Sequence, residues 1–527
     1  IQNRASSCKT NFHHLKGRTT SFKIPLHRIK TSLHISLLVF FISTTTLHAQ
    51  LDQTDMAADL NEALTFTKYP TYAQYDSVMH YFADSYPEIC RIDTFGTSIQ
   101  GRLLLAVKIS DNPNTDEDEP AFLYTSTMHG DELVGYVLSL RLIDFILSNY
   151  GADPEIDRIV DELEIWINPL SNPDGAYYHD GDTTNRDTTV AYSRRYNLNG
   201  TDLNRDFPEV PDANPEDLSS VEPENIHMIR FLEKHRFNLS ANMHSGAEVV
   251  NYPWDYTYTL HPDDDWYRFI SREYADGVHA VEPNYMLGFD NGITNGAVWY
   301  IITGGRQDFV NYFLHGREVT LELSDIKKLP SELLDPYWSY NQWSLINYIS
   351  QARYGVHGKV TCRRTGVPAP AEIRVMDHDS NNSWVRSDSV YGSFYRYLKE
   401  GVYDLLVSAE GFVSDTVWSV AVYDHQRTEL LVELDSLGTG DRGMALQQAF
   451  VCFPNPATEV LHLRGSKPFE PGAQLEVFAV SGARVLTEAL RQGTQLHRID
   501  VSGMEQGVYL LRIRNGREVF NLRFVKQ

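Results

Sequence analysis

The sequence predicts an α/β domain with a central mixed, mostly parallel sheet flanked by helices, followed by two small all-β sandwich domains. Helical and strand-like patterns alternate from about residue 60 to 351, and the helical pattern stops near residue 354. Only short strands and turns follow to residue 527. Alternation is typical of a parallel sheet covered by helices, whereas short strands separated by turns are typical of sandwiches.

The elements of the first domain follow from the spacing of apolar residues. A spacing of three to four predicts helices, at 71–86, 132–150, 222–236 and 264–279. Short apolar runs rich in strand-forming residues predict strands, at 103–109, 121–127, 163–168, 239–243 and 319–323. In a sheet of this kind the functional site lies at the carboxyl ends of the strands.

The second and third domains are expected to contain strands only. The strands of the first sandwich are predicted at 357–362, 372–376, 402–409 and 427–434. The run SLGTGDRG, which begins at Ser436, has the composition of a linker. We therefore expect a pre-region at 1–50, the α/β domain at 51–353, a β-sandwich at 354–435, a linker at 436–445 and a second sandwich at 446–527.

The charge of the chain excludes some partners. Residues 1–50 hold seven Lys and Arg and no acid, which leaves 39 basic and 70 acidic groups, a formal charge of −31, in the remainder. A surface this acidic repels phosphate backbones and anionic lipid, so binding to nucleic acid or to a membrane surface is disfavoured.

The N-terminal region has the pattern of a secretory signal. Arg28 and Lys30 precede the apolar run Leu33–Ile42, and a polar stretch leads to a cleavage position after Ala49 or Gln50. An N-terminal anchor is the alternative, but about ten apolar residues cannot span roughly 30 Å of hydrocarbon. We expect an exported protein whose mature chain has no transmembrane segment.

The remaining cysteines do not suggest a disulfide framework or a cysteine-based zinc site, because they lie far apart at Cys90, Cys362 and Cys452. We expect them to be isolated small side chains in the domain cores.

Three His-x-x-Glu tetrads are candidates for a metal site. A His and a Glu three residues apart can share one zinc ion where a strand turns into a loop or a helix. Only His129–Glu132 follows a clear strand and opens a long predicted helix, whereas His279 and His315 are interpreted as surface residues. A catalytic zinc needs a third protein ligand and one open position. His244, at the end of the strand 239–243, is the candidate, although a histidine there is often only structural.

Six motifs occur in the order found in zinc metallocarboxypeptidases. They are HGDE at 129–132, NPDG at 172–175, RYNLNGTDLNRDFP at 195–208, ANMHSGA at 241–247, NGAVWY at 295–300 and VTLELS at 319–324. The sequence most closely resembles the regulatory branch, the relatives of carboxypeptidases N, E, M and D. Those enzymes carry a transthyretin-like sandwich after the catalytic domain, and residues 354–435 are similar to one.

The C-terminal residues resemble a different family. PNPATEVLHL at 454–463, VSGARV at 480–485, IDVSGMEQGVYLLRI at 499–513 and the final FVKQ are similar to the C-terminal sorting domain of the type IX secretion system of Bacteroidetes. The resemblance implies passage across the outer membrane, with the type IX machinery as a partner. An ordinary β-sandwich adhesion module is the alternative.

The resemblance implies one Zn²⁺ per catalytic domain, held by His129, Glu132 and His244. Asp202 matches the family's carboxylate that bonds the far nitrogen of a ligand histidine and so fixes its tautomer. Glu322 matches the general base that takes a proton from the catalytic water.

The substrate contacts are also implied by the resemblance. Arg195 matches the arginine that stabilises the oxyanion, and its neighbour Arg194 has the less suitable spacing. Asn204 and Arg205 match the pair that grips the substrate's terminal carboxylate. Tyr300 matches the mobile tyrosine that closes over the substrate.

Asp255 coincides with the acidic residue that this branch places in the pocket for the final side chain, and Gln307 matches its polar companion. An acidic pocket would favour a terminal Lys or Arg. Phe309 departs from the family's usual tyrosine, which we interpret as a packing change.

We therefore expect a secreted or cell-surface zinc carboxypeptidase that releases C-terminal Lys or Arg from peptides or proteins. A carboxypeptidase acting on bacterial cell-wall peptides is one alternative. A catalytically inactive surface-binding protein is another, and it is disfavoured because all three ligands, the base and Arg195 are present.

Overall fold

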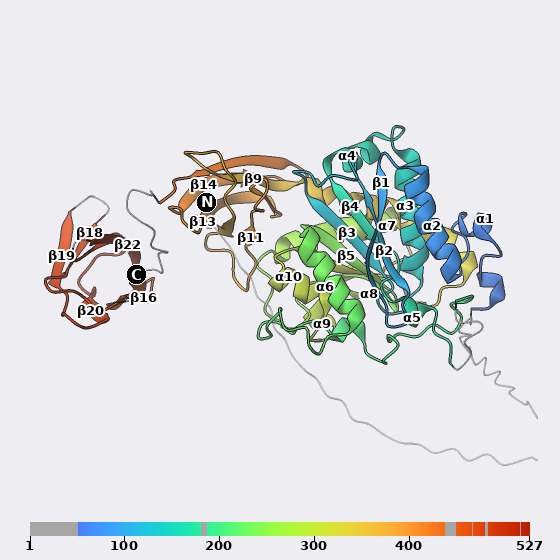
Figure 1. Cartoon of the computed structure of the whole chain (residues 1–527), viewed down its shortest axis with the longest axis horizontal. Helices are drawn as coiled ribbons and strands as arrows, with labels where there is room; N and C mark the ends of the chain where they lie inside the picture. Colours follow the sequence, from blue (N-terminus) through green and yellow to red (C-terminus); the bar gives the residue numbers. More distant parts are fainter. Residues whose placement is uncertain (1–50, 181–186, 438–449, 466, 480–482, 517) are drawn as a thin grey trace, which may run out of the picture. The chain divides into compact units, whose positions relative to one another are not determined.

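The computed structural model describes residues 51–527 except 181–186, 438–449, 466, 480–482 and 517 (Figure 1). The predicted secretory signal and most of the predicted linker lie outside the described residues.

The first domain is built on an eight-stranded sheet in the order β1-β2-β4-β3-β5-β8-β6-β7. The strands are β1 (Cys90–Thr97), β2 (Leu103–Ile109), β3 (Ala121–Ser126), β4 (Glu164–Asn168), β5 (Leu239–His244), β6 (Ala247–Tyr252), β7 (Ile293–Asn295) and β8 (Arg317–Ser324). The pairs β3–β4, β3–β5, β5–β8 and β6–β7 are parallel, and the other three are antiparallel. The predicted mixed, mostly parallel sheet is confirmed.

Helices cover both faces of this sheet (Figure 1). They are α1 (Leu60–Ala63), α2 (Tyr72–Ser85), α3 (Val134–Asn149), α4 (Pro154–Glu162), α5 (Pro173–Ala176), α6 (Pro223–His235), α7 (Asp264–Val281), α8 (Gly288–Asn291), α9 (Gly296–Trp299), α10 (Arg306–Phe313) and α11 (Leu334–Ser350). Phe122 and Tyr124 of β3 pack into the core shared with α2, α3, α4, α7 and α11, whereas Leu123 packs into the core shared with α6 and α10. This alternation follows from the two-residue period of a strand.

Residues 355–434 contain strands only, as predicted. They are β9 (Gly355–Cys362), β10 (Ala371–Val375), β11 (Val385–Arg386), β12 (Ser393–Arg396), β13 (Gly401–Ala409), β14 (Asp415–Val422) and β15 (Arg427–Leu434). The sheets β11-β10-β13-β14 and β12-β9-β15 share one buried core, which is the arrangement of a small sandwich.

The C-terminal residues form a second all-β unit with a core of its own. Its strands are β16 (Phe450–Phe453), β17 (Val460–Gly465), β18 (Gln474–Ala479), β19 (Arg484–Ala489), β20 (Leu496–Asp500), β21 (Gly507–Asn515) and β22 (Glu518–Lys526). They make the sheets β16-β17-β20 and β19-β18-β21-β22.

The three cysteines of the described residues are free, and two of them are buried. A search of the described residues found no helix with the length and apolar character that crossing a membrane requires.

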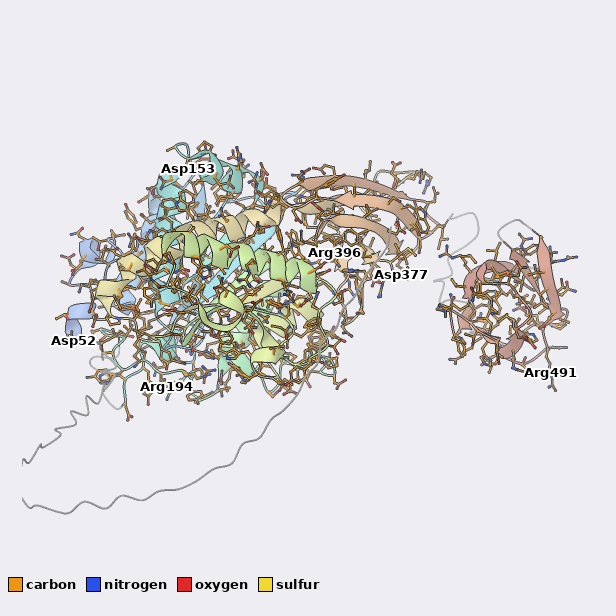
Figure 2. All side chains as sticks on the ribbon, turned by 180° about the vertical axis from the view of Figure 1, so that it is seen from behind. Asp52, Asp153, Arg194, Asp377, Arg396 and Arg491 are labelled. Carbon is orange, nitrogen blue, oxygen red and sulfur yellow. The ribbon has the colours of Figure 1, made fainter. Side chains whose placement is uncertain are left out.

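A buried ion cluster joins the first sandwich to the α/β domain. Arg396, on β12 (Figure 2), donates from Nη1 and Nη2 to the two carboxylate oxygens of Asp263, at 2.7 and 2.8 Å. Arg317, the first residue of β8, donates from Nε to Asp263 Oδ2 at 3.0 Å. The second amino group of Arg396 also reaches Asp379 Oδ1 at 2.6 Å. Because Asp263 and Arg396 are fully buried, the cluster ties β12 to the N-terminus of α7.

Candidate zinc site and substrate pocket

The three predicted metal ligands meet at the carboxyl end of the central strands. His129 and Glu132 lie in the turn between β3 and α3, and His244 is the last residue of β5. Since β3 and β5 are parallel neighbours, with Ser126 opposite Met243, their carboxyl ends lie at the same sheet edge. The helix α3 begins at Val134, so the expectation that Glu132 opens it is wrong: Glu132 lies in the preceding turn, where its N–H bonds the carbonyl of His129.

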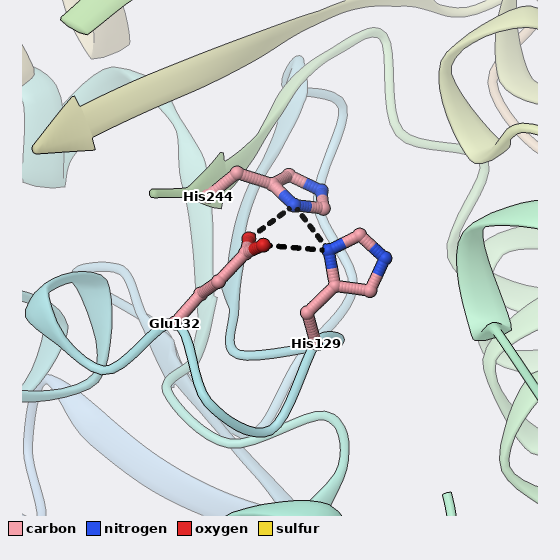
Figure 3. Close-up of side chains that lie close together, drawn as sticks. All are labelled: His129, Glu132 and His244. Carbon is pink, nitrogen blue, oxygen red and sulfur yellow. Dashed lines mark hydrogen bonds and ion pairs between the residues drawn. The ribbon is translucent and has the colours of Figure 1, made fainter. Parts of the chain in front are cut away.

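The ligand atoms lie at distances that suit a metal ion (Figure 3). His129 Nδ1 is 3.1 Å from Glu132 Oε1, and His244 Nδ1 is 2.8 Å from Glu132 Oε2 and 3.1 Å from His129 Nδ1. All three side chains are buried. Zinc bonds of about 2.0–2.2 Å in a tetrahedron place ligand atoms about 3.3–3.6 Å apart, so shifts of a few tenths of an ångström accommodate the ion. Two histidines and a carboxylate are a donor set typical of catalytic zinc, and the site fits it.

The protonation states of His244 and Glu132, two of the three ligands, also suit metal binding. The pKa of His129 is raised instead, because burial lowers it less than Glu132 and Asp202 raise it. Burial lowers the pKa of His244 to about 4, more than Glu132 raises it, which leaves a neutral imidazole. Burial alone would raise the pKa of Glu132, but His129 and His244 hold it well below its usual value. A neutral imidazole and an ionised carboxylate are the forms that bind zinc.

Asp202 and Arg195 support this centre from one side. Asp202 Oδ1 lies 2.9 Å from His129 Nε2, the nitrogen that faces away from the other ligands. Arg195 donates from Nε to Asp202 Oδ2 at 2.9 Å and from Nη1 to Glu132 Oε1 at 3.3 Å. The neighbouring Arg194 stacks over Tyr178 instead and donates to the carbonyl of Leu198.

Glu322 faces the same cleft as His244. The two residues lie opposite each other on the parallel strands β5 and β8, so their side chains leave the sheet on the same face. Leu321 and Leu323 point to the other face and join the core there. Within the described residues, Glu322 Oε2 has no hydrogen-bond partner. Burial, and then Glu132, raise the pKa of Glu322 well above its usual value.

Lys327 contacts the metal ligand Glu132, but no motif in the sequence indicated this contact. Its Nζ lies 2.7 Å from Glu132 Oε1, and its carbonyl accepts the backbone N–H of Leu133 at 2.9 Å. It lies in the loop after β8, and only the path of that loop brings it to Glu132.

Asp255 and Gln307 form a buried polar cluster with Asn251. Sequence reasoning did not identify Asn251. Asp255 Oδ1 accepts from Asn251 Nδ2 and from Gln307 Nε2, both at 3.1 Å. In the described part of the chain, no side-chain donor to Asp255 Oδ2 is found. Burial raises the pKa of Asp255 to about 6, although Asn251 and Arg205 act to lower it.

Two features fix the shape of this pocket. Asp308 accepts the backbone N–H groups of Asp255 and Tyr256, at 3.0 and 2.9 Å. A Cβ atom on Gly296 would stand 1.7 Å from Asp255 Oδ1, so only glycine leaves the carboxylate room.

The remaining predicted substrate contacts lie on two separate segments of the chain. Asn204 and Arg205 lie in a short 3₁₀ helix, Leu203–Arg205, where Asn204 Oδ1 accepts the backbone N–H of Arg306 at 3.0 Å. Tyr300 directly follows α9 and is 49% exposed. Phe309 is fully buried against Phe207 and Phe313.

The other two tetrads have structural contacts. His279 Nε2 lies 3.3 Å from the carbonyl oxygen of Met286, and His315 Nδ1 lies 2.9 Å from that of Asn382. Glu318 is fully buried and accepts from Arg306 Nη2 at 2.8 Å, so it forms a structural ion pair. Neither tetrad is part of a metal-like cluster in the described ranges.

Comparison with known proteins agrees with this geometry. The zinc carboxypeptidase family matches residues 75–344, about half of the chain and all of the strands that carry the site. The chain belongs to the zinc carboxypeptidase family. It is therefore a zinc-dependent metallocarboxypeptidase, with His129, Glu132 and His244 as its candidate metal ligands.

Named relatives support the predicted branch. The chain is 37% identical to carboxypeptidase SOL1 of Arabidopsis thaliana, over 66% of this chain and 70% of that protein. It is 34% identical to carboxypeptidase M of Mus musculus, over 62% of this chain and 75% of that protein. It is also 34% identical to carboxypeptidase D of Rattus norvegicus, over 63% of this chain but only 24% of that longer protein.

The C-terminal prediction is confirmed as well, because a secretion system C-terminal sorting domain matches residues 451–527 of this carboxypeptidase.

Proposed function

We propose that this carboxypeptidase is secreted and releases C-terminal Lys or Arg from peptides or proteins. The observation that carries the proposal is the buried side chain of Asp255, whose side-chain hydrogen bonds within the described residues come from the uncharged Asn251 and Gln307. A buried carboxylate without a cation is costly. The ammonium or guanidinium of a substrate's last residue would pair with it, whereas Phe or Leu would leave it uncompensated.

His129, Glu132 and His244 would hold a zinc ion, which would supply a water of lowered pKa and polarise the scissile carbonyl. Glu322 leaves the sheet on the same side as His244, and its Oε2 has no hydrogen-bond partner among the described residues. Glu322 would accept the proton of that water and pass it to the leaving amine.

Cationic side chains orient the substrate and stabilise the developing charge. Arg195 stands beside Glu132 and Asp202, where its guanidinium stabilises the oxyanion formed on the scissile carbonyl. Arg205, with Asn204, binds the terminal carboxylate, which restricts cleavage to the last peptide bond. Tyr300 closes over the bound residue and excludes water.

The other domains have separate roles in this proposal. Residues 354–435 are a transthyretin-like domain, which the two-sheet core at 355–434 supports. The sorting domain directs export by the type IX secretion system, after a signal peptide in residues 1–50 has been removed. Deleting residues 451–527 in the producing bacterium should then retain the protein inside the cell, as a blot of medium and cell fractions would show.

The specificity test uses the purified chain 51–527 and two peptides that differ only in a final Arg or Phe. We expect release of Arg, loss of that release with a zinc chelator, and recovery when zinc is restored. Release of Phe in preference to Arg would refute the Asp255 pocket while leaving the zinc mechanism intact. Absence of release from both peptides after zinc is restored would refute the proposal and favour a cell-wall peptide substrate or a binding role.

A further inference from the structure

The segment 287–301, which contains Tyr300, carries five exposed apolar side chains. Leu287 and Phe289 are about half exposed, as are Tyr300 and Ile301, and Val298 is 68% exposed. Soluble proteins expose single apolar residues commonly, but a contiguous group beside a binding site marks an interaction surface.

Three of the rings form a continuous series, which we call the aromatic ladder: Phe289, Trp299 and Tyr300. The ring centroids of Phe289 and Trp299 are 5.0 Å apart with planes at 72°, and those of Trp299 and Tyr300 are 4.9 Å apart at 77°. These are edge-to-face contacts, which leave ring faces available to a further apolar group. The ladder therefore extends from Tyr300 outward to Phe289.

The outer end of the ladder is held in place by its loop. Phe289 has φ +57° and ψ −136°, a conformation that non-glycine residues rarely adopt unless the surroundings impose it. Arg272 of α7 donates to the carbonyls of Asp290 and Asn291, both at 2.6 Å. The backbone thus presents the Phe289 ring to solvent at a strained position, instead of burying it.

The inner end of the ladder is continuous with the Asp255 pocket. The backbone N–H of Ala297 donates to the carbonyl of Trp254 at 2.8 Å, and that of Ile302 donates to the carbonyl of Asp255 at 3.2 Å. Since Tyr300 is proposed to close over the substrate's last residue, the residues that precede it are within reach of the rings that continue from Tyr300.

We propose that the aromatic ladder binds an apolar or aromatic side chain among the three residues that precede the substrate's C-terminal residue. This inference rests on the proposed function. The enzyme would then select peptides that combine a cationic last residue with an apolar residue upstream. One ring–ring contact of this kind corresponds to a roughly three- to tenfold gain in binding.

The test uses the purified chain 51–527 and four peptides that end in Arg. One carries only Ala at the three preceding positions, and each of the others carries Phe at one of them. We expect a KM lower by roughly three- to tenfold for one Phe peptide than for the Ala peptide, at similar kcat. In Phe289→Gly, which removes the ring and suits the positive φ, this ratio should fall toward one, whereas Phe289→Tyr should retain it.

The matched control is Trp418→Ala, which removes a 60% exposed indole from β14 of the sandwich and should leave the ratio unchanged. Equal KM values for all four peptides, or a ratio that survives Phe289→Gly, would overturn the inference. A dimer in sedimentation that Phe289→Gly converts to a monomer would also overturn it, because a second copy would then occupy the ladder. Failure to release Arg from every peptide would instead refute the proposed function itself.

Discussion

Replacing Arg396 with Met tests whether the sandwich is an integral part of the catalytic fold. The guanidinium of Arg396 is fully buried, and it donates twice to Asp263, once to Asp379 Oδ1 and once to the carbonyl of Tyr397. Methionine fills much of the same space but supplies no charge and no donor. The change removes one positive charge and leaves Arg317 and His378 beside two buried carboxylates.

The expected cost follows from these contacts. Removing one partner of a buried ion pair costs about 3–5 kcal/mol, because the remaining charge stays buried without compensation. For a denaturant slope of about 3 kcal/mol/M, the urea midpoint should fall by roughly 1 M or more. The measurement is urea unfolding of the chain 51–527 at pH 7, followed by tryptophan fluorescence, with Arg396→Lys as the charge-retaining comparison.

A second substitution makes this experiment specific to the cluster. Adding Asp379→Asn to Arg396→Met removes the carboxylate that was left unpaired, so the double variant should recover part of the lost stability. A loss below about 1 kcal/mol for Arg396→Met would refute the argument. Equal losses in the single and double variants would show that the cost arises from packing.

Three further predictions concern the active centre. In Asp255→Asn, kcat/KM for the Arg peptide should fall on the order of a hundredfold. The pKa of Asp255 is raised to about 6, so Asp255 becomes protonated as pH falls from 7 to 5. In the unsubstituted enzyme, KM for the Arg peptide should therefore rise over this range. A parallel rise in Asp255→Asn would contradict the assignment. In Glu322→Gln, kcat should fall by roughly 10²–10⁴-fold while the zinc content by atomic absorption stays the same, and a variant that loses zinc would indicate a ligand role instead. In Asp202→Asn, zinc affinity by competition with a coloured chelator should weaken by about 10–100-fold, and unchanged affinity would separate Asp202 from the metal centre.

Local patterns predicted the parts of the site that lie on strands. His244 and Glu322 are placed by strands whose limits are visible in the apolar pattern, and the two-residue period decides which side of the sheet each one faces. The turn that carries His129 and Glu132 follows another such strand. These relations depend on residues close together in the sequence.

Contacts made by the tertiary fold could not be predicted in this way. Lys327 reaches Glu132 across 195 positions of the chain, and Arg396 reaches Asp263 across 133. The burial of Glu318 could not be predicted for the same reason, since its partner Arg306 lies on a different element, α10. Periodicity describes the face of one element and not what packs against it.

The loop from Trp254 to Asp263 shows how the fold separates the shape of the pocket from its charge. Asp308 holds one end of the loop through the backbone N–H groups of Asp255 and Tyr256. At the other end, Arg317 and Arg396 hold Asp263. Neither anchor uses the side chain of Asp255, whose side-chain partners within the described residues are Asn251 and Gln307. An amide at position 255 should therefore remove the charge of the pocket while the loop keeps its path, so that a change in substrate preference reports on electrostatics and not on a collapsed pocket.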